Sequence, residues 1–484
     1  MKIVIVGGGI AGLSAYLHLR KHLPSYSERD ITIYESHRPR STTASSSAQD
    51  HPNQSVNLDA LSESTAIVGG GLGIAPNGMR VLRDLNLDLH DRVVTQGFPA
   101  EKFVFKGANG WTLGMQSTSD KFVRSEGGPE EVCIASSRHG LWHTMRKYVV
   151  EKYGDDVMKH GKVLKVYRDK GRATQHLQVR LFNEQGMETI VPADLVIGAD
   201  GVKSVVRRCL FGDDERYRPV YSGQSGVGGF YNTTIPSVIA DNKAMVFEFG
   251  GNGFFGYSSG GPITGKQLMW WSTFETSSLP DTRDVDPWDI KYALMDRHKH
   301  WKDPIIQDII INADVESIYP TWTMPELPHW GEGGIVLIGD AAHALDPTTG
   351  QGASQAMEDA QTFALLLAEV FNIEQCRSTR PKWAIDQAIE MYFEIRSPRV
   401  RKIVERGKKL SGSKASVGIV QEYCMYLFLW LLMKLPCLGK AITGNNNREL
   451  YCWSAKQQVR EAIQSSQFFS TPYAGVSEAS LLLG

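Results

Sequence analysis

Short apolar runs, each followed by a segment with helical spacing, occur at the start of the chain and again after residue 334. Ile3–Val6 and Ile31–Tyr34 are runs of mainly β-branched residues, typical of buried parallel strands. The leucines that follow Gly12 recur at helical spacing between these two runs. Ile335–Ile338 is a third apolar run, and a helical pattern starts at Gln351. Strand, turn and helix in this order predict an α/β fold.

The hydrophobic pattern is different between Tyr217 and Trp330, where short runs alternate between apolar and polar residues. Such spacing predicts a mostly antiparallel sheet that forms a second layer. Residues 98–123 alternate in the same way and are expected to join it. The predicted strands of the later part are Ser225–Tyr231, Ala244–Phe249, Gly253–Tyr257 and Gln267–Phe274.

The C-terminal part is predicted to be helical. Ala384–Val404 has one apolar face, and Tyr423–Leu438 is apolar throughout until Lys434 and Pro436. This second run is shorter than the ~20 residues that a membrane-spanning helix needs. The sequence favours packing on the main body of the protein or on a dimer partner over membrane association for 423–438.

Composition excludes several classes of protein. Hydrophobic residues make up 42% and charged residues 22% of the 484 residues, and the net charge is −1. These values are ordinary for a globular protein and give no indication of nucleic-acid binding. Six scattered cysteines without a Cys-x-x-Cys pair fit a reducing compartment. No metal site is expected, and because the chain opens directly on a strand we expect a cytoplasmic protein.

The first predicted strand is followed by a glycine-rich turn. Gly7, Gly9 and Gly12 form G-x-G-x-x-G between strand and helix. The first glycine permits the turn, the second lets a pyrophosphate approach, and the third allows close packing of helix on strand. Glu35 ends the next strand, where an acid binds the adenosine ribose. Together they predict a dinucleotide site.

The third run ends in a second arrangement that suits a cofactor. Asp340 follows the strand, and Pro347, Gly350 and Gly352 keep the turn before the next helix free of bulky side chains. Ala353 lies in the first turn of that helix. A bare helix start offers backbone N–H groups and the positive end of the helix dipole. A hydroxyl acceptor beside such a helix start suits a flavin, with the ribityl chain at Asp340.

These motifs resemble a known family. Gly339–Asp340, His343, Pro347 and Gly350–Gly352 are similar to the second FAD fingerprint of the group A, single-component flavin monooxygenases, the para-hydroxybenzoate and salicylate hydroxylase relatives. Asp200–Gly201 resembles the Asp-Gly motif of that family. The order of the three fingerprints along the chain matches the family.

The resemblance implies a fold like that of para-hydroxybenzoate hydroxylase, with residues 1–90, 131–210 and 331–380 as a discontinuous FAD-binding domain. Residues 91–130 and 211–330 would form the substrate-binding sheet domain, and 381–484 the C-terminal helical region. It also implies that Gly70 and Gly71 lie along the flavin and that Arg138 meets its phosphates or ribityl chain. Pro347 would lie at the reaction centre. The predicted cofactor-binding residues are Gly7, Gly9, Gly12, Glu35, Gly70, Gly71, Arg138, Asp200, Gly201, Asp340, Gly350, Gly352 and Ala353.

The activity that the resemblance implies is oxygen insertion with FAD, with NAD(P)H as a transient co-substrate. In the family, reduced flavin and molecular oxygen form a C4a-hydroperoxide that attacks the substrate. Gly228 occupies the position where relatives carry an arginine, which argues against a simple benzoate-like acid. We expect a larger electron-rich aromatic or polycyclic substrate, hydroxylated or epoxidised, in secondary metabolism. Tyr257 is the candidate for a substrate hydrogen bond.

Two other functions remain open at this point. One is a flavin-dependent reductase of the geranylgeranyl-reductase type, and the other is a flavoprotein-fold binding module without redox turnover. The sequence leaves open whether the protein is a monomer or a homodimer.

Overall fold

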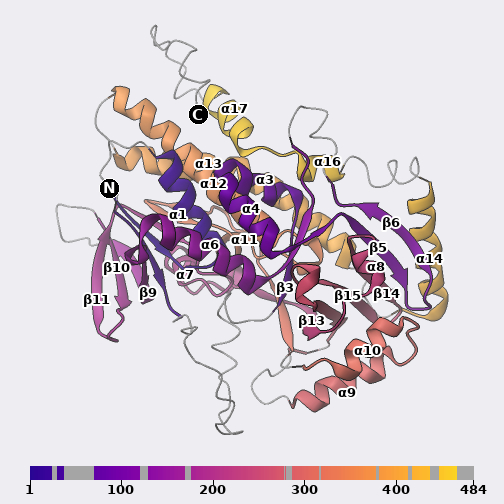
Figure 1. Cartoon of the computed structure of the whole chain (residues 1–484). Coiled ribbons are helices and arrows are strands. Elements are labelled where there is room, and N and C mark those ends of the chain that lie inside the picture. The colour runs from indigo at the N-terminus through magenta and orange to yellow at the C-terminus, as the bar shows by residue number, and fades with distance from the viewer. Residues whose placement is uncertain are drawn as a thin grey trace.

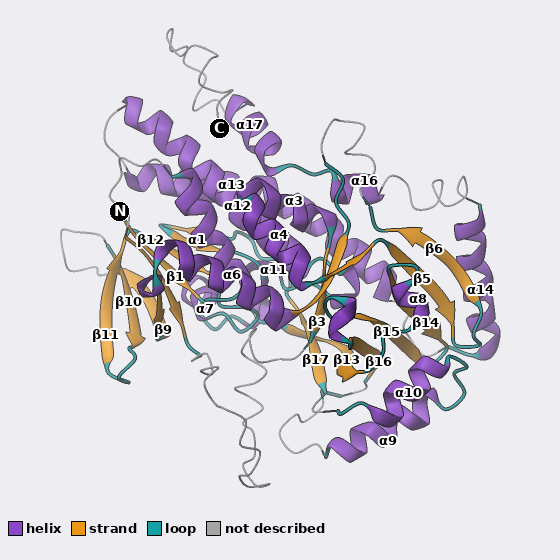
Figure 2. Ribbon diagram, viewed as in Figure 1, coloured by secondary structure: helices purple, strands orange, loops and turns teal. Residues whose placement is uncertain are grey.

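The computed structural model describes residues 1–23, 30–37, 70–119, 129–168, 176–276, 278–279, 286–315, 318–377, 381–411, 417–435 and 446–465. Two large sheets dominate it, and helices pack around both (Figures 1 and 2).

The first sheet is the predicted parallel one. Its order is β18-β19-β12-β1-β2-β8. β1, β2, β12 and β19 run parallel to one another, and β8 runs parallel to β2, whereas β18 is antiparallel to β19. The strands are β1 (Lys2–Val6), β2 (Asp30–Glu35), β8 (Met158–His160), β12 (Leu195–Gly198), β18 (Gly331–Glu332) and β19 (Ile335–Leu337).

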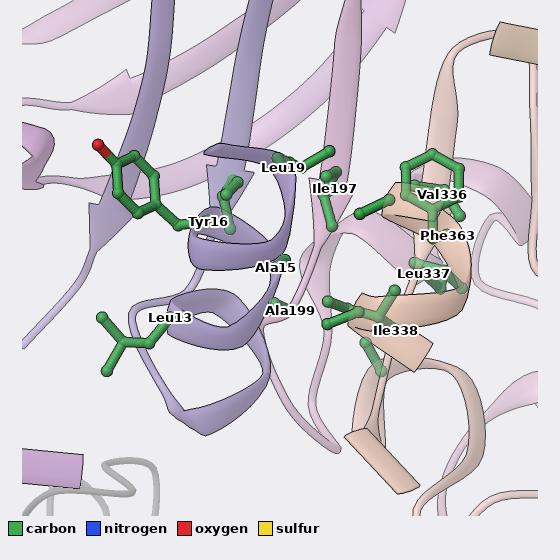
Figure 3. Packing of buried hydrophobic residues seen from close by; sticks show 14 of the residues in the cluster. Leu13, Ala15, Tyr16, Leu19, Ile197, Ala199, Val336, Leu337, Ile338 and Phe363 are labelled. Carbon is green, nitrogen blue, oxygen red and sulfur yellow. The ribbon is translucent and has the colours of Figure 1, made fainter. Parts of the chain in front are cut away.

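Helices pack on this sheet, and the hydrophobic core lies between the helices and the sheet. The helix α1 (Ile10–His22) packs against α12 (Gly352–Arg377), which also contacts α3 (Pro76–Leu85) and α13 (Pro381–Ser411). In Figure 3, buried side chains of α1 lie near Ile197 of β12 and Val336 of β19. The fold class predicted from the apolar runs is therefore confirmed.

The second sheet has seven strands in the order β17-β13-β16-β15-β14-β5-β6. The neighbours are antiparallel except for β14 and β5, which are parallel, so the sheet is mixed. The four strands predicted in the later part of the chain all exist. The strands are β5 (Lys102–Gly107), β6 (Thr112–Ser117), β13 (Val220–Asn232), β14 (Ala244–Gly250), β15 (Gly253–Ser259), β16 (Gln267–Glu275) and β17 (Tyr319–Thr323).

Two helices between β16 and β17 were missed by the sequence prediction. They are α9 (Pro287–His298) and α10 (Pro304–Asn312), and they lie below the seven-stranded sheet in Figure 1. Asp286 and Asp303 cap them, accepting hydrogen bonds from Trp288 N and Ile305 N, both at 2.9 Å. An Asp-Pro pair at a helix start is a capping signal that the sequence carries at both places.

Two three-stranded sheets complete the β structure. β9 (Lys162–Arg168) and β10 (Leu177–Phe182) pair antiparallel, and β11 (Glu188–Ala193) extends this pair. β7 (Cys133–Ser137) pairs with β3 (Gly71–Ile74) and with β4 (Phe98–Ala100). β4 therefore pairs outside the seven-stranded sheet, although residues 98–123 were expected to join that sheet.

The remaining helices lie between or after these sheets. α4 (Leu87–Gln96) follows α3, α6 (Arg138–Tyr153) follows β7, and α7 (Val205–Phe211) follows β12. The C-terminal part contains α13, α14 (Ile419–Lys434), α16 (Asn446–Tyr451) and α17 (Ala455–Ser465). None of the helices in the described part of the chain is long and apolar enough to cross a membrane.

Burial of an acid in the seven-stranded sheet makes stability depend on pH. Glu248 of β14 is fully buried, with Lys106 Nζ 3.9 Å from its carboxylate. Burial, and then the charge of Asp303, raise the pKa of Glu248 to about 9. The pKa of Glu248 is higher in the folded than in the unfolded protein, so the folded protein binds this proton more tightly. This contribution to the unfolding free energy is fully present below the unfolded-state pKa and is lost as the pH rises towards 9.

We therefore expect Glu248→Gln to remove a decline in unfolding free energy on the order of 1 kcal/mol per pH unit between neutral pH and pH ~9. Urea unfolding of the wild type and the variant across this range measures the decline. Parallel stability curves for the two proteins would contradict the burial argument.

Candidate active site

Four parallel strands that are far apart in the sequence end at the same edge of the first sheet. β1 leads into Gly7, β2 ends at Glu35, β12 leads to Asp200, and β19 is followed closely by Asp340. Ligands of open α/β sheets bind at the carboxyl ends of the strands. The structure thus brings four of the predicted cofactor residues to one edge.

The first glycine turn has the geometry that its sequence predicts. Gly7 has φ +101°, and a Cβ there would lie 2.4 Å from the carbonyl oxygen of Ala199. A Cβ on Gly12 would lie 2.0 Å from the carbonyl oxygen of Gly7. Gly9 precedes α1 as its N-cap and offers no side chain there. Side chains at Gly7 and Gly12 are therefore excluded by sterics.

Glu35 is hydrogen-bonded to the backbone of this turn. Its Oε2 accepts a hydrogen bond of 2.7 Å from Gly8 N, and its Oε1 accepts one of 2.9 Å from His37 N. Burial raises the pKa of the Glu35 carboxyl, but the hydrogen bonds from His37 and Gly8 outweigh burial and the net shift is downward. Glu35 is a hydrogen-bond acceptor as an anion, which is what a ribose hydroxyl requires.

Arg138 is placed close to the same turn by its helix. Ser137 caps α6 by accepting a hydrogen bond of 2.8 Å from Gly140 N, and Arg138 is the first residue of that helix. Trp142, one turn later, donates from Nε1 to the carbonyl oxygen of Gly8 at 2.8 Å. Arg138 N donates to Gly70 O at 3.0 Å, while its side chain is exposed.

Gly70 and Gly71 connect the nucleotide part to the second sheet. No described atom lies within 4 Å of a Cβ built on Gly70. A Cβ on Gly71, by contrast, would lie 1.8 Å from the sulfur of Met269 on β16. At the other end of the same short strand, Ala75 N donates to Ser354 Oγ of α12 at 3.2 Å. β3 therefore lies between the start of α12 and the seven-stranded sheet.

The Asp-Gly motif has a structural task in the protein itself. Asp200 accepts hydrogen bonds from Ser204 Oγ at 2.5 Å and from Val205 N and Val206 N at 2.7 and 3.1 Å, at the start of α7. Burial raises its pKa although these bonds lower it. Gly201 has φ +75° and open space at its Cβ position. A direct contact of Asp200 with the cofactor remains a prediction.

The second fingerprint forms an open surface. Gly339 has φ +59°, and the exposed Asp340 begins the short helix α11 (Asp340–His343). Pro347 begins the 3-10 turn η4 (Pro347–Thr349) and is exposed. Gly350 then takes the left-handed conformation at φ +59° before α12 begins at Gly352, with Ala353 as its second residue.

These residues fit a flavin. Cβ atoms on Gly70, Gly350 or Gly352 would meet no described atom within 4 Å, so the space above these turns is open. The first residues of α12, a helix of 26 residues, supply unpaired backbone N–H groups of the kind that favour negative charge. The exposed carboxylate of Asp340 provides the hydroxyl acceptor.

A buried ion network lies beneath this surface. Asp359 of α12 accepts hydrogen bonds from Gly339 N at 2.8 Å, His343 Nε2 at 2.6 Å and Arg396 Nε at 2.8 Å. Arg396 of α13 also donates to Glu358 Oε2 at 2.6 Å. Arg396, Glu358 and Asp359 are each at most 1% exposed. The network fixes the turn that presents Asp340.

The charges in this network balance one another. Burial raises the pKa of Asp359, but His343 and Arg396 hold it at about 2. Burial lowers the pKa of Arg396, but the two acids outweigh it and the net shift is upward. Arg399 pairs with Glu358 at 2.7 Å, which gives the two acids two arginines. Asp359 therefore stays ionised throughout the physiological range.

The sequence analysis did not find this network. Its signal is the adjacent pair Glu358–Asp359 between the apolar residues Met357 and Ala360, because acids rarely lie on a buried face unless they are paired. Asn77 of α3 joins it, donating from Nδ2 to Gln351 Oε1 at 3.1 Å and to Glu358 Oε1 at 2.7 Å. His343 of the second fingerprint is tied to Asp359 through its Nε2.

The seven-stranded sheet has two different faces, because neighbouring residues of a strand point to opposite sides. One face carries Met269, which meets Gly71, and a group of aromatic side chains. Most of these rings are only partly buried, unlike an ordinary core. Their centroids lie close together, for example 5.9 Å between Phe247 and Trp271. The aromatic residues of this face are Phe103, Phe105, Phe247, Phe249, Phe254 and Trp271.

Tyr257 lies on the opposite face, which α9 and α10 cover. It is fully buried, and its hydroxyl donates to Asp303 Oδ2 at 2.7 Å. Trp270 pairs with it across the strands, and Phe255 stacks on Trp270 at 5.7 Å. The structure therefore does not bring Tyr257 to the face that carries Met269 and Gly71, and the predicted substrate hydrogen bond gains no support from this placement.

Gly228 is explained by packing. It pairs with Trp271 on the neighbouring strand, and a Cβ at Gly228 would lie 2.7 Å from the carbonyl oxygen of Trp270. A longer side chain is incompatible with this backbone spacing. The face therefore lacks a cation at this position and has the large Trp271 ring beside it.

Comparisons with known proteins agree with the geometry. Residues 54–407 match the family model described as an FAD binding domain, which covers well over half of the chain. Residues 5–61 match an NAD(P)-binding Rossmann-like domain. The chain belongs to the FAD-binding family of the group A flavin monooxygenases. FAD is therefore its cofactor, as the fingerprints predicted.

Several curated relatives are monooxygenases by name. The chain is 30% identical to the aurachin C monooxygenase/isomerase of Stigmatella aurantiaca, over 76% of this chain and 84% of the relative. It is 25% identical to the 3-amino-4-hydroxybenzoate 2-monooxygenase of Streptomyces cremeus, over 85% and 87%. It is also 25% identical to the chloroplastic zeaxanthin epoxidase of Spinacia oleracea over 79% of this chain, but spans about half (49%) of that relative.

Solved structures share the fold. A salicylate hydroxylase in a substrate complex superposes with a TM-score of 0.65 at 16% identity, covering 96% of this chain and 99% of the other. HpxO of Klebsiella pneumoniae with FAD and uric acid gives a TM-score of 0.62 at 20% identity, covering 96% of each chain. The expected likeness to the para-hydroxybenzoate hydroxylase fold is confirmed.

The ion network predicts a large asymmetry between two arginines of α13. Arg396→Met leaves two buried acids with less compensation and should lower the unfolding free energy by about 3–5 kcal/mol. Arg401→Met removes an exposed pair with Glu326 and should cost less than about 1 kcal/mol. Denaturant unfolding of both variants measures the difference, and equal losses would contradict the role of the network.

Asp340 is expected to bind a hydroxyl of the cofactor. Asp340→Ala should lower FAD affinity by ~1.5–3 kcal/mol, which is the range for a hydrogen bond to a charged group. Fluorescence titration of the apoprotein with FAD measures this. Asp296→Ala, which removes an exposed carboxylate on α9, is the control and should leave the affinity unchanged. Full flavin retention by Asp340→Ala at low FAD concentration would refute the assignment.

Proposed function

We propose that this protein is an NAD(P)H-consuming FAD monooxygenase that hydroxylates or epoxidises an electron-rich aromatic or polycyclic molecule. The observation that carries the proposal is the position of β3. At one end it bonds to Ser354 beside the open start of α12, and at the other Gly71 contacts Met269 on the aromatic face. These contacts support a single site in which the cofactor turns and the aromatic face are adjacent.

Each part of the site has a task in this proposal. Bound FAD supplies the electrons and the activation of oxygen. Glu35 and Asp340 would accept hydroxyl hydrogen bonds from the cofactor, and the start of α12 would stabilise negative charge near the ring. Arg138, with its exposed side chain near Gly70, would meet a phosphate. Pro347 lies on the exposed turn between Asp340 and α12, which supports its predicted place at the reaction centre.

The aromatic face supports an apolar substrate. Five of its six rings are partly exposed, so they offer surface that a flat ligand can cover. Such contact would exclude water from the reacting atoms and orient the substrate by stacking. Gly228 has no positively charged side chain that could bind a substrate carboxylate. Two relatives act, by their names, on zeaxanthin and aurachin C, and this supports a large substrate for this chain as well.

A flavin-dependent reductase is the second candidate, because it needs the same cofactor turns. The two activities differ in oxygen use. We expect NADPH oxidation by the purified protein to rise with one member of a panel of phenols, indoles and polyenes, with oxygen uptake in equal measure. NADPH oxidation that continues under nitrogen with turnover of the ligand would favour the reductase, and a protein that holds no flavin would favour a binding module.

A variant of the aromatic face tests the placement of the substrate. Trp271→Ala should weaken binding of the stimulating ligand by ~1.5–3 kcal/mol, the contribution of one large apolar side chain, and leave FAD content unchanged. The matched control is Trp288→Ala, which removes an exposed tryptophan on α9. KM values from NADPH oxidation measure the effect. Equal KM values for Trp271→Ala and the wild type would place the substrate elsewhere.

A further inference from the structure

The helix α14 is apolar on all sides, yet it lies on the outside of the protein. Every one of its 16 residues is described, and among them Tyr426 is the buried one. Figure 1 shows α14 at the edge of the molecule beside β6. Apolar helices of this kind are normally enclosed by other elements.

The exposed side of α14 continues onto the β5–β6 hairpin. Ile419 and Val420 are 71% and 73% exposed, Leu427 is 57% and Phe428 49%. Trp111 of the hairpin is 59% exposed and contacts Tyr423 with ring centroids 5.7 Å apart. We call this surface the α14 patch; it consists of Ile419, Val420, Tyr423, Leu427, Phe428 and Trp430 on the helix and Trp111 on the hairpin.

The patch is held firmly in place. The Tyr426 hydroxyl accepts a hydrogen bond of 3.0 Å from Ala108 N and lies 2.7 Å from Phe249 O, with its one proton between Phe249 O and Glu422 Oε1, so it joins α14 to the ends of β5 and β14. Gly107 and Gly114 allow close approach, because Cβ atoms there would collide with Tyr426 and Met433. The exposed side chains therefore form a fixed surface and not the face of a loosely attached helix.

We propose that the α14 patch docks onto the surface of an anionic lipid bilayer. The charges around it suit this partner. Exposed Lys434 ends the helix, and exposed Lys302 lies next to Gly110 at the hairpin turn beside Trp111. Glu422, the acid of α14, bonds inward to Tyr426. Tryptophan and tyrosine among aliphatic residues, flanked by lysines, are the composition of an interfacial helix.

A second copy of this chain suits the patch less well. A helix of 16 residues is about 24 Å long and ~10 Å wide, so the patch offers roughly a few hundred Å². A stable dimer needs about 800 Å² from each partner. A bilayer needs no such area, because each apolar side chain that inserts adds to binding independently.

The inner side of α14 links this surface to the substrate site, and this step rests on the proposed function. Gly107 and Gly114 belong to the same sheet face as the aromatic residues, so α14 covers one end of that face. A substrate dissolved in the bilayer would reach the aromatic face beside α14 without crossing water. The substrate class that follows is an apolar molecule that partitions into lipid.

Flotation of the FAD-bound protein with vesicles of phosphatidylcholine, with and without phosphatidylserine, tests the docking. We expect binding that is stronger with phosphatidylserine. The double variant Phe428→Gln/Trp430→Gln should bind at least about tenfold more weakly. Lys434→Glu should lose about fivefold on the anionic vesicles alone. The control is Trp288→Gln/Tyr292→Gln, which changes two aromatic residues on α9 that are each 75% exposed and should bind as the wild type does.

The outcomes separate this proposal from the others. Absence of binding to both kinds of vesicle, or equal losses in the α14 and α9 variants, would overturn it. A dimer in light scattering that Phe428→Gln/Trp430→Gln dissociates, without vesicle binding, would assign the patch to a second copy. Because flotation needs neither NADPH nor substrate, its result does not depend on whether the proposed oxygenase activity is correct.

Discussion

The arrangement of the site depends on a charge that is buried behind it. Asp359 holds the turn after β19 through Gly339 N, holds His343, and is itself held by Arg396. These contacts join a strand end, the first turns of α12 and the middle of α13. Moving a charge from water into the protein interior costs free energy. Each charged member of the set therefore needs its partners to offset that cost. The open surface formed by Asp340, Gly350 and Gly352 can lack side-chain packing because the acids below it, Glu358 and Asp359, are paired with Arg396.

Two sheets with different tasks meet at this surface. The carboxyl ends of β1, β2, β12 and β19 lie at one edge of the parallel sheet, because parallel strands all end on the same side. The mixed sheet has one face closed by α9 and α10 and another with partly exposed rings. β3 is the piece that brings the second face to the first edge. The cofactor turns and the apolar face therefore belong to different sheets, and β3, a strand of a third sheet, lies between them.

Sequence reasoning found the parts whose constraint is local. Gly7 and Gly12 are required by backbone contacts within one turn, and the short runs at 244–249 and 253–257, separated by residues 250–252, form the antiparallel pair β14–β15. It missed α9 and α10 because it took the whole stretch from 217 to 330 as a sheet and did not use their Asp-Pro caps. Tyr257 was assigned to the substrate because alternation shows that a strand has two faces but not which face meets the cofactor. The pairing of Glu358 and Asp359 with Arg396 spans 37 residues or more, and no local pattern reports it.

Mass spectrometry of product formed under ¹⁸O₂ tests the central claim most directly. The purified protein would be supplied with NADPH and with the ligand that most stimulates NADPH oxidation. The account predicts that one ¹⁸O atom appears in the product, because the site combines an FAD cradle with an apolar face that excludes water. A product that is reduced and carries no ¹⁸O would contradict it and identify a reductase built on the same fold.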